Sequence, residues 1–126
     1  WLPQPAEWAG LSVAAQTGDP HSTLELYRAA LRIRRQDPDL GAGDAVTWLD
    51  APAGTLAFRR GGFVCTVNTT GEAVRITAPG AVLLASGAEA PTGEAPAGGA
   101  PAGGAPVADE EGFVLLDADT TVWWRG

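Results

Sequence analysis

The stretch at residues 22–36, STLELYRAALRIRRQ, decides the fold because it predicts an amphipathic helix with an unusually wide apolar face. Apolar side chains repeat with a period of 3.6 on two adjacent stripes. These stripes are Leu24, Tyr27, Leu31 and Arg34, and beside them Leu26, Ala30 and Ile33. An isolated helix of this length is marginal in water, so the face must pack against something. Its width exceeds what the neighbouring residues can cover, and the helix therefore looks like half of an interface.

Both ends of this helix are signalled in the sequence. Ser22 is followed three residues later by Glu25, the spacing of a capping box, and Pro38 cannot continue a helix. Arginines cluster toward the C-terminal end, where the helix dipole favours positive charge. We therefore expect the helix to begin after Ser22 and to end before Pro38.

Composition limits the classes of protein and of partner. The chain has 126 residues, 45% of them hydrophobic, which is the size and content of one globular domain. A net charge of −7 argues against nucleic acid, because binding a phosphate backbone needs a basic face. No run approaches the roughly 18 to 20 apolar residues that cross a bilayer, so we expect a soluble, cytoplasmic protein with no membrane partner.

A single cysteine, Cys65, excludes an internal disulfide or a cysteine metal cluster, and we expect it to be a small core residue. We expect no metal site and no cofactor. The sequence contains no methionine and starts Trp-Leu-Pro, which suggests a piece of a longer polypeptide.

Residues 1–21 contain prolines, glycines and two tryptophans without a sustained period, which predicts an extended, ordered loop before the helix. Trp1 and Trp8 have two interpretations. They fill a groove on the rest of a parent protein, or one of them stacks on a sugar ring.

After Pro38 a glycine-rich break changes the period of the sequence from 3.6 to 2, which places a domain boundary between residues 1–42 and 43–126. Seven short alternating segments follow, separated by turn residues. They lie at residues 46–49, 56–59, 63–67, 74–76, 81–86, 113–116 and 121–125. This pattern predicts a mainly β fold, in which one N-terminal helix precedes a small antiparallel β-sandwich.

Residues 87–106 interrupt the strands with a repeat, in which Ala-Pro-Ala-Gly-Gly at 95–99 recurs at 100–104. The segment has too little apolar surface to offset its ordering entropy. We therefore expect a flexible surface loop.

Several short sequence segments, in their order along the chain, resemble the C-terminal end of glycoside hydrolase family 13, the α-amylase superfamily. The closest resemblance is to its α-glucosidase and oligo-1,6-glucosidase branch. The segments are Trp1-Leu2-Pro3, Ser12-Val13-Ala14-Ala15-Gln16, Asp19-Pro20-His21-Ser22-Thr23-Leu24, Tyr27-Arg28, Leu31-Arg32-Ile33-Arg34, Asp44, Val67-Asn68-Thr69-Thr70, Leu84-Ala85-Ser86 and Asp119-Thr120-Thr121-Val122-Trp123-Trp124. None of them is a catalytic motif.

The resemblance implies that residues 1–21 follow the last strand of a catalytic (β/α)8 barrel, that the helix is the last barrel helix, and that residues 43–126 are the family's β-sandwich. The partner would be the barrel of the same chain. The parent would hydrolyse α-glucosidic bonds with retention, using carboxylates upstream of Trp1, so no catalytic residue is expected here. Trp1 and Trp8 would be substrate-binding residues at the rim of the sugar cleft.

Two other functions stay open. An independent carbohydrate-binding module would use Trp48, Trp123 or Trp124 as a stacking platform, although neighbouring Trp123 and Trp124 must point to opposite faces of a strand. A structural fragment whose helix docks on an unrelated partner is the third possibility.

Overall fold

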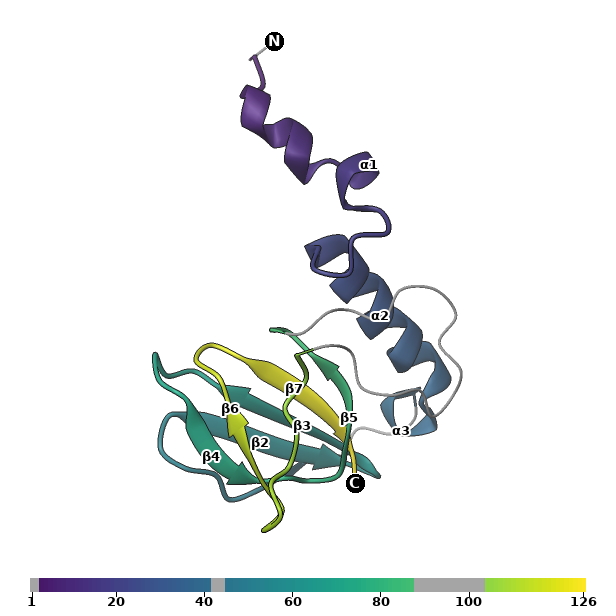
Figure 1. Ribbon diagram of the computed structural model, residues 1–126. Helices are drawn as coiled ribbons and strands as arrows, with labels where there is room; N and C mark the ends of the chain where they lie inside the picture. The colour runs from purple at the N-terminus through teal and green to yellow at the C-terminus, as the bar shows by residue number, and fades with distance from the viewer. Residues whose placement is uncertain (1–2, 42–44, 88–103) are drawn as a thin grey trace.

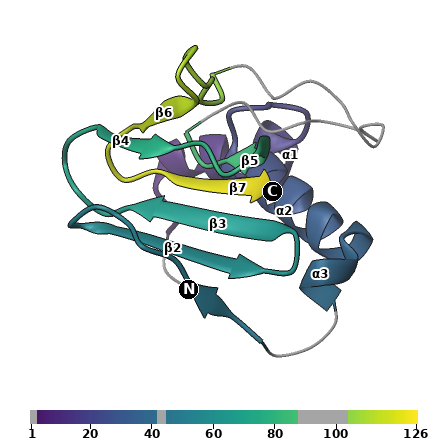
Figure 2. The ribbon, with the colours of Figure 1, turned by 90° about the horizontal axis from the view of Figure 1, so that it is seen from below.

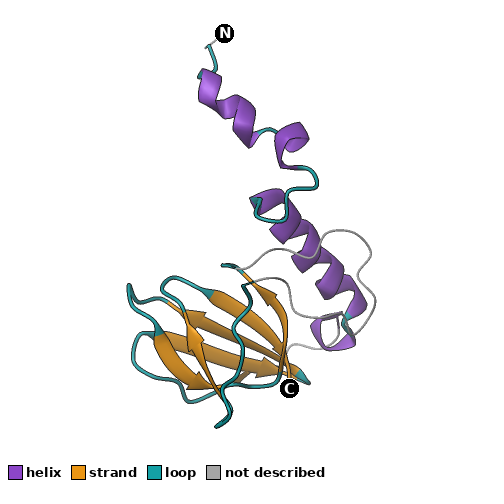
Figure 3. Ribbon diagram, viewed as in Figure 1, coloured by secondary structure: helices purple, strands orange, loops and turns teal. Residues whose placement is uncertain are grey.

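The computed structural model describes residues 3–41, 45–87 and 104–126. Trp1, the predicted domain boundary and most of the Ala/Pro/Gly repeat lie outside these residues. Within them the expected architecture is confirmed: a small antiparallel sandwich follows an N-terminal helical segment (Figures 1 and 3).

The segment before the long helix is helical, so the prediction of an extended loop is wrong. The helical elements are η1 (Ala6–Leu11, a 3-10 helix), α1 (Val13–Gln16), α2 (Thr23–Gln36) and α3 (Pro38–Gly41). Ser12 joins the first two, because its hydroxyl donates to the Ala9 carbonyl at 2.8 Å and accepts from the Ala15 N–H at 3.2 Å. One side chain thus ends η1 and caps α1, a local bond that hydrophobic periodicity does not reveal.

Helix α2 has the predicted limits but only half of the predicted capping box. The Ser22 hydroxyl accepts from the Glu25 N–H at 3.2 Å, as expected of an N-cap. The Glu25 carboxylate does not return to Ser22. It accepts from the Gly18 N–H at 3.0 Å, and so holds the preceding turn against the helix.

All seven predicted strands form, and they make two antiparallel sheets. They are β1 (Thr47–Trp48), β2 (Thr55–Arg60), β3 (Phe63–Asn68), β4 (Val74–Thr77), β5 (Ala81–Ala85), β6 (Phe113–Leu116) and β7 (Thr121–Arg125). The larger sheet has the order β1-β2-β3-β7-β5, and β4 pairs with β6 in the smaller one. Figure 2 shows α2 beside the larger sheet and β1 at the edge farthest from β4 and β6.

The main core lies between the sheets. It consists of Val64, Ala85, Val114, Leu116, Val122 and Trp124. The Trp124 Nε1 donates to the Thr66 Oγ1 at 2.8 Å, which satisfies the indole inside the core. Trp123 points to the opposite face of the sheet, as expected, and packs beneath α2.

The two apolar stripes of α2 have different surroundings. Leu26, Ala30 and Ile33, with the fully buried Ala29, pack against Leu84 of β5 and Trp123 of β7. On the other stripe, Tyr27 is 64% and Leu31 is 52% exposed. The sandwich therefore covers one stripe, and within the described residues Tyr27 and Leu31 of the other stripe stay largely exposed.

Candidate functional site: a partner-facing surface

Residues 3–36, here called the helical arm, carry a group of exposed apolar side chains. The arm extends away from the sandwich (Figure 1), and residues 3–15 are all exposed. Large exposed apolar side chains recur along it. They are Trp8, Leu11, Val13, Tyr27 and Leu31. Five such residues on one continuous element exceed the scattered exposure that is normal for a folded surface.

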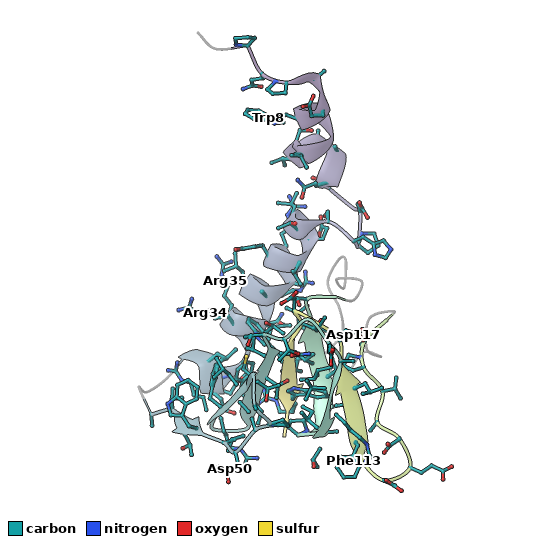
Figure 4. All side chains as sticks on the ribbon, turned by 90° about the vertical axis from the view of Figure 1, so that its left-hand side faces the viewer. Trp8, Arg34, Arg35, Asp50, Phe113 and Asp117 are labelled. Carbon is teal, nitrogen blue, oxygen red and sulfur yellow. The ribbon has the colours of Figure 1, made fainter. Side chains whose placement is uncertain are left out.

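One of these side chains, Trp8, projects to the same side of the molecule as the uncovered stripe of α2. We call Tyr27, Leu31 and Arg34 the free stripe. In Figure 4, Trp8, Arg34 and Arg35 all project to the left of the helical arm. Because Arg34 lies on the stripe of Tyr27 and Leu31, the free stripe and Trp8 face the same side of the molecule.

A network of side-chain bonds fixes the turn between α1 and α2. The Gln16 Nε2 donates to the Leu11 carbonyl at 2.8 Å, and the Gln16 Oε1 accepts from the Leu24 N–H at 3.0 Å. The Ser22 hydroxyl donates to the carbonyls of Asp19 and Gln16, at 2.7 and 2.9 Å. Gln16 therefore links η1, α1 and α2. Its place in the segment Ser12–Gln16, which carries part of the family resemblance, is the only sequence signal for this role.

The charged carboxylate of Glu25 adds an ion pair and a hydrogen bond to this turn. The hydrogen bond from the Gly18 N–H, and then the bond from Arg28, hold the pKa of the Glu25 carboxyl below its usual value despite burial. Arg28 Nη1 lies 2.7 Å from Glu25 Oε1. A charged, buried carboxylate thus joins the turn to the first two turns of α2.

A clamp fixes the other end of α2 to the sandwich. The Arg125 guanidinium of β7 bonds to Asp37, the C-cap of α2, and donates to Asp39 Oδ2 at 3.0 Å. The same oxygen accepts from the Gly62 N–H at 2.9 Å. Gly61 has φ of 59°, and a Cβ there would lie 2.4 Å from Asp39 Oδ1, so this turn requires glycine.

The clamp includes a buried carboxylate, because the Asp37 side chain is only 3% exposed. Its partner, Arg125, is 88 residues away in sequence, so no local pattern could identify the pair.

The three tryptophans proposed as a sugar platform lie in three different environments. Trp124 is in the core, and Trp123 packs edge-on against Phe63, with ring centroids 5.4 Å apart, beneath α2. Trp48 is 68% exposed and lies edge-on to Phe58 at 5.8 Å. Of these three, only Trp48 offers a wide surface.

A cavity of about 400 Å³ opens between the two sheets. Most of its walls are apolar, from residues such as Leu49, Ile76 and Leu116. Arg75 at its edge is neutralised by Asp109 and Glu111, at 3.1 and 2.7 Å. Its walls carry no arrangement of acid and base that indicates chemistry.

Among the residues that the structure describes, no three His, Cys, Asp or Glu side chains are grouped as metal ligands would be. None of the helices within those residues has the length and hydropathy needed to cross a bilayer. Of the two predicted substrate-binding residues, Trp8 is exposed on η1 and Trp1 lies outside the described residues.

Comparison with known proteins finds curated relatives and solved structures that resemble this chain. No family model matches the chain. It is 33% identical over 81 residues to malto-oligosyltrehalose trehalohydrolase of Rhizobium sp. (strain M-11), a match that covers 62% of this chain and 13% of that protein. It is 40% identical over 76 residues to the enzyme of the same name from Brevibacterium helvolum, covering 57% of this chain and 13% of the relative.

The fold matches part of a larger solved enzyme. Trehalulose synthase MutB from Pseudomonas mesoacidophila MX-45 superposes with a TM-score of 0.66 over 99% of this chain and 21% of that one, at 24% identity. A MutB variant from crystals soaked with trehalulose gives 0.67, over 100% of this chain and 22% of that one. This chain therefore spans about one-eighth of its curated relatives and about one-fifth of the solved enzyme.

These findings support the resemblance to glycoside hydrolase family 13 at the level of the family. They do not select the α-glucosidase branch. The match to MutB includes the helical arm as well as the sandwich, since it covers the whole chain.

Proposed function

We propose that this chain is the non-catalytic C-terminal portion of a family 13 glycoside hydrolase and that it stabilises the catalytic barrel of the same polypeptide. Residues 3–36 would lie against the barrel through Trp8 and the free stripe. The sandwich would hold α2 in position through the Arg125 clamp.

The observation that carries the proposal is the division of α2 into one covered and one free stripe. The sandwich already packs against Leu26, Ala30 and Ile33, so it cannot also cover Tyr27 and Leu31 on the adjacent side. Burying a large apolar side chain contributes roughly 1.5–3 kcal/mol. The free stripe is therefore worth several kcal/mol to whatever covers it, and the partial length match to the relatives supports a covering segment of the same chain.

The activity of the whole protein follows as part of the proposal. The parent would cleave α-glucosidic bonds with retention, through a carboxylate nucleophile and a carboxylic acid about 5 Å apart on the barrel. The α-glucosidase branch, a cytoplasmic location and an oligosaccharide substrate belong to the same proposal. The relatives' names, which refer to malto-oligosyltrehalose and trehalulose, support α-linked glucosides as the substrate class.

Two experiments test the proposal. The coding sequence upstream of Trp1 should encode a barrel with an aspartate and a glutamate at strand ends, and a start codon directly before Trp1 would contradict it. The purified chain should show no turnover of 4-nitrophenyl α-glucoside, whereas the full-length protein should hydrolyse it. Turnover by the chain alone would overturn the assignment as non-catalytic.

The proposed substrate-binding role of Trp1 and Trp8 has its own test. Replacing either residue with alanine in the full-length enzyme should raise KM or change the preferred chain length if the side chain lines a sugar subsite. A lower melting temperature with unchanged kinetics would show that the tryptophans only pack.

A further inference from the structure

A row of apolar side chains crosses the outer face of the larger sheet, and among the described residues its β1 end is the exposed end. Cross-strand pairs connect Leu84 to Trp123, Trp123 to Cys65, Cys65 to Phe58, and Phe58 to Trp48, in one row from β5 to β1. Helix α2 covers the Leu84 and Trp123 end of this row. At the other end, Trp48 is 68% exposed.

A second exposed apolar residue adjoins this end of the row. Leu56 lies two residues before Phe58 on β2, so it is on the same face, and it is 51% exposed. We call Trp48, Leu56 and Phe58 the free sheet patch. Single exposed apolar residues need no explanation, but a contiguous patch at a sheet edge is an aggregation hazard unless something covers it.

The free sheet patch lies on the side toward which Trp8 and the free stripe project. In Figure 4, Trp8 and Arg34 project to the side where the β1 and β2 edge of the sandwich lies, and Figure 2 places β1 at that edge. The outer face of the sheet is also the face from which α2 rises. The helical arm and the outer face of the larger sheet therefore border the same space, here called the corner.

We propose that the free sheet patch is a second docking site for the catalytic portion of the same polypeptide, which would sit in the corner between the helical arm and the sheet. This inference rests on the proposed function and adds the sandwich itself to the interface. The partner surface would be apolar where it meets Trp48 and Leu56. It would be acidic where it meets Arg34, at the end of the free stripe, and the next residue, Arg35, both of which are exposed.

Two observations favour this occupant over others. The whole of this chain matches MutB, but about four-fifths of MutB lies outside the matched part. Most of such a polypeptide is therefore available to fill the corner. The ring that packs edge-on against Trp48 is Phe58, which offers no hydrogen bonds to a sugar. A protein surface fits an apolar patch of this kind better than a carbohydrate does.

A matched pair of substitutions in the full-length protein tests the inference. Leu56 and Leu115 are both strand leucines, 51% and 60% exposed, but Leu115 lies on β6 of the smaller sheet, away from the corner. We expect Leu56→Thr to lower the midpoint of thermal inactivation by about 2 °C or more and Leu115→Thr to leave it unchanged. Equal midpoints for the two variants would overturn the inference, since threonine suits a strand at both positions.

Labelling the full-length protein with 5-fluorotryptophan separates this inference from the proposed function. Tryptophan-to-phenylalanine variants assign the fluorine resonances, and the shift between H2O and D2O reports exposure. Loss of the solvent shift at both Trp8 and Trp48 supports the inference. A retained shift at Trp48 alone overturns it and leaves the proposed function standing, whereas retained shifts at both overturn both.

Two other results would also overturn it. Burial of Trp48 that depends on protein concentration would assign the patch to a second copy of the chain. A change in the Trp48 resonance on addition of maltose would assign it to a carbohydrate.

Discussion

Arg125, on the last strand, bonds to the buried carboxylate of Asp37 at the C-cap of α2. The same guanidinium holds Asp39, which also receives the Gly62 N–H of the turn between β2 and β3. Three segments far apart in sequence thus meet at one arginine. The direction of the helical arm depends on this junction, because the junction holds the C-terminal end of α2, the last helix of the arm.

Replacing Arg125 with methionine should destabilise the chain, because Asp37 would then be buried without its partner. Leaving a buried charged group unsatisfied costs about 1–3 kcal/mol or more. Urea unfolding measures this loss, with Arg34→Met as the control, since Arg34 is an exposed arginine of α2, the helix that the clamp holds. An equally small loss in both variants would show that the clamp contributes nothing.

Asn68 should tolerate no substitution, because it is 1% exposed and joins two strands to the turn that follows β3. Its amide nitrogen donates to the carbonyls of Glu72, Leu116 and Asp117, and its oxygen accepts from the Thr70 N–H and hydroxyl. We expect Asn68→Asp to lower the free energy of unfolding by more than about 2 kcal/mol, since a carboxylate would face three carbonyl oxygens. Unchanged stability at pH 7 would contradict this role.

Acidification should release the turn between α1 and α2. Because the pKa of Glu25 is lowered in the fold from its usual 4.5, mainly by the Gly18 N–H, the carboxylate stabilises the fold fully above pH 4.5. This stabilisation is lost as the pH falls through the lowered pKa. The amide resonance of Gly18 should titrate with that pKa in the wild type and not in Glu25→Gln, and the same titration in both would exclude Glu25 as the cause.

Cys65 should be inert in the folded chain. Burial raises the pKa of its thiol to about 11, so almost no thiolate exists at pH 8. Ellman's reagent should therefore label the protein only after denaturation. Rapid labelling of the native protein at pH 8 would contradict the burial of Cys65, which is 5% exposed.

The elements predicted from the sequence are those set by local patterns. Alternating residues located every strand, and Ser22 and Pro38 located the ends of α2. The error over residues 1–21 arose because Ser12, a single polar side chain, organises two short helices that have no apolar period of their own.

Contacts between segments that are distant in sequence, and the order of the strands in the sheets, were not predicted. The pairing of Arg125 with Asp37 joins distant segments, and the order in which β5 lies beside β7 depends on how the sheets close. The sequence also showed that Trp123 and Trp124 face opposite ways, but it could not show that α2 covers the first of them. The width of the apolar face of α2 was visible, whereas its division into a covered and a free stripe was not.

The most direct test of the central claim is hydroxyl-radical footprinting of the full-length protein, with oxidation measured by mass spectrometry at Tyr27, Leu31 and Leu115. All three are more than half exposed in this chain. If the free stripe lies against the catalytic barrel, Tyr27 and Leu31 should be protected severalfold while Leu115 is oxidised at the rate of an exposed leucine. Oxidation of Tyr27 and Leu31 at the rates of freely exposed side chains would contradict the account.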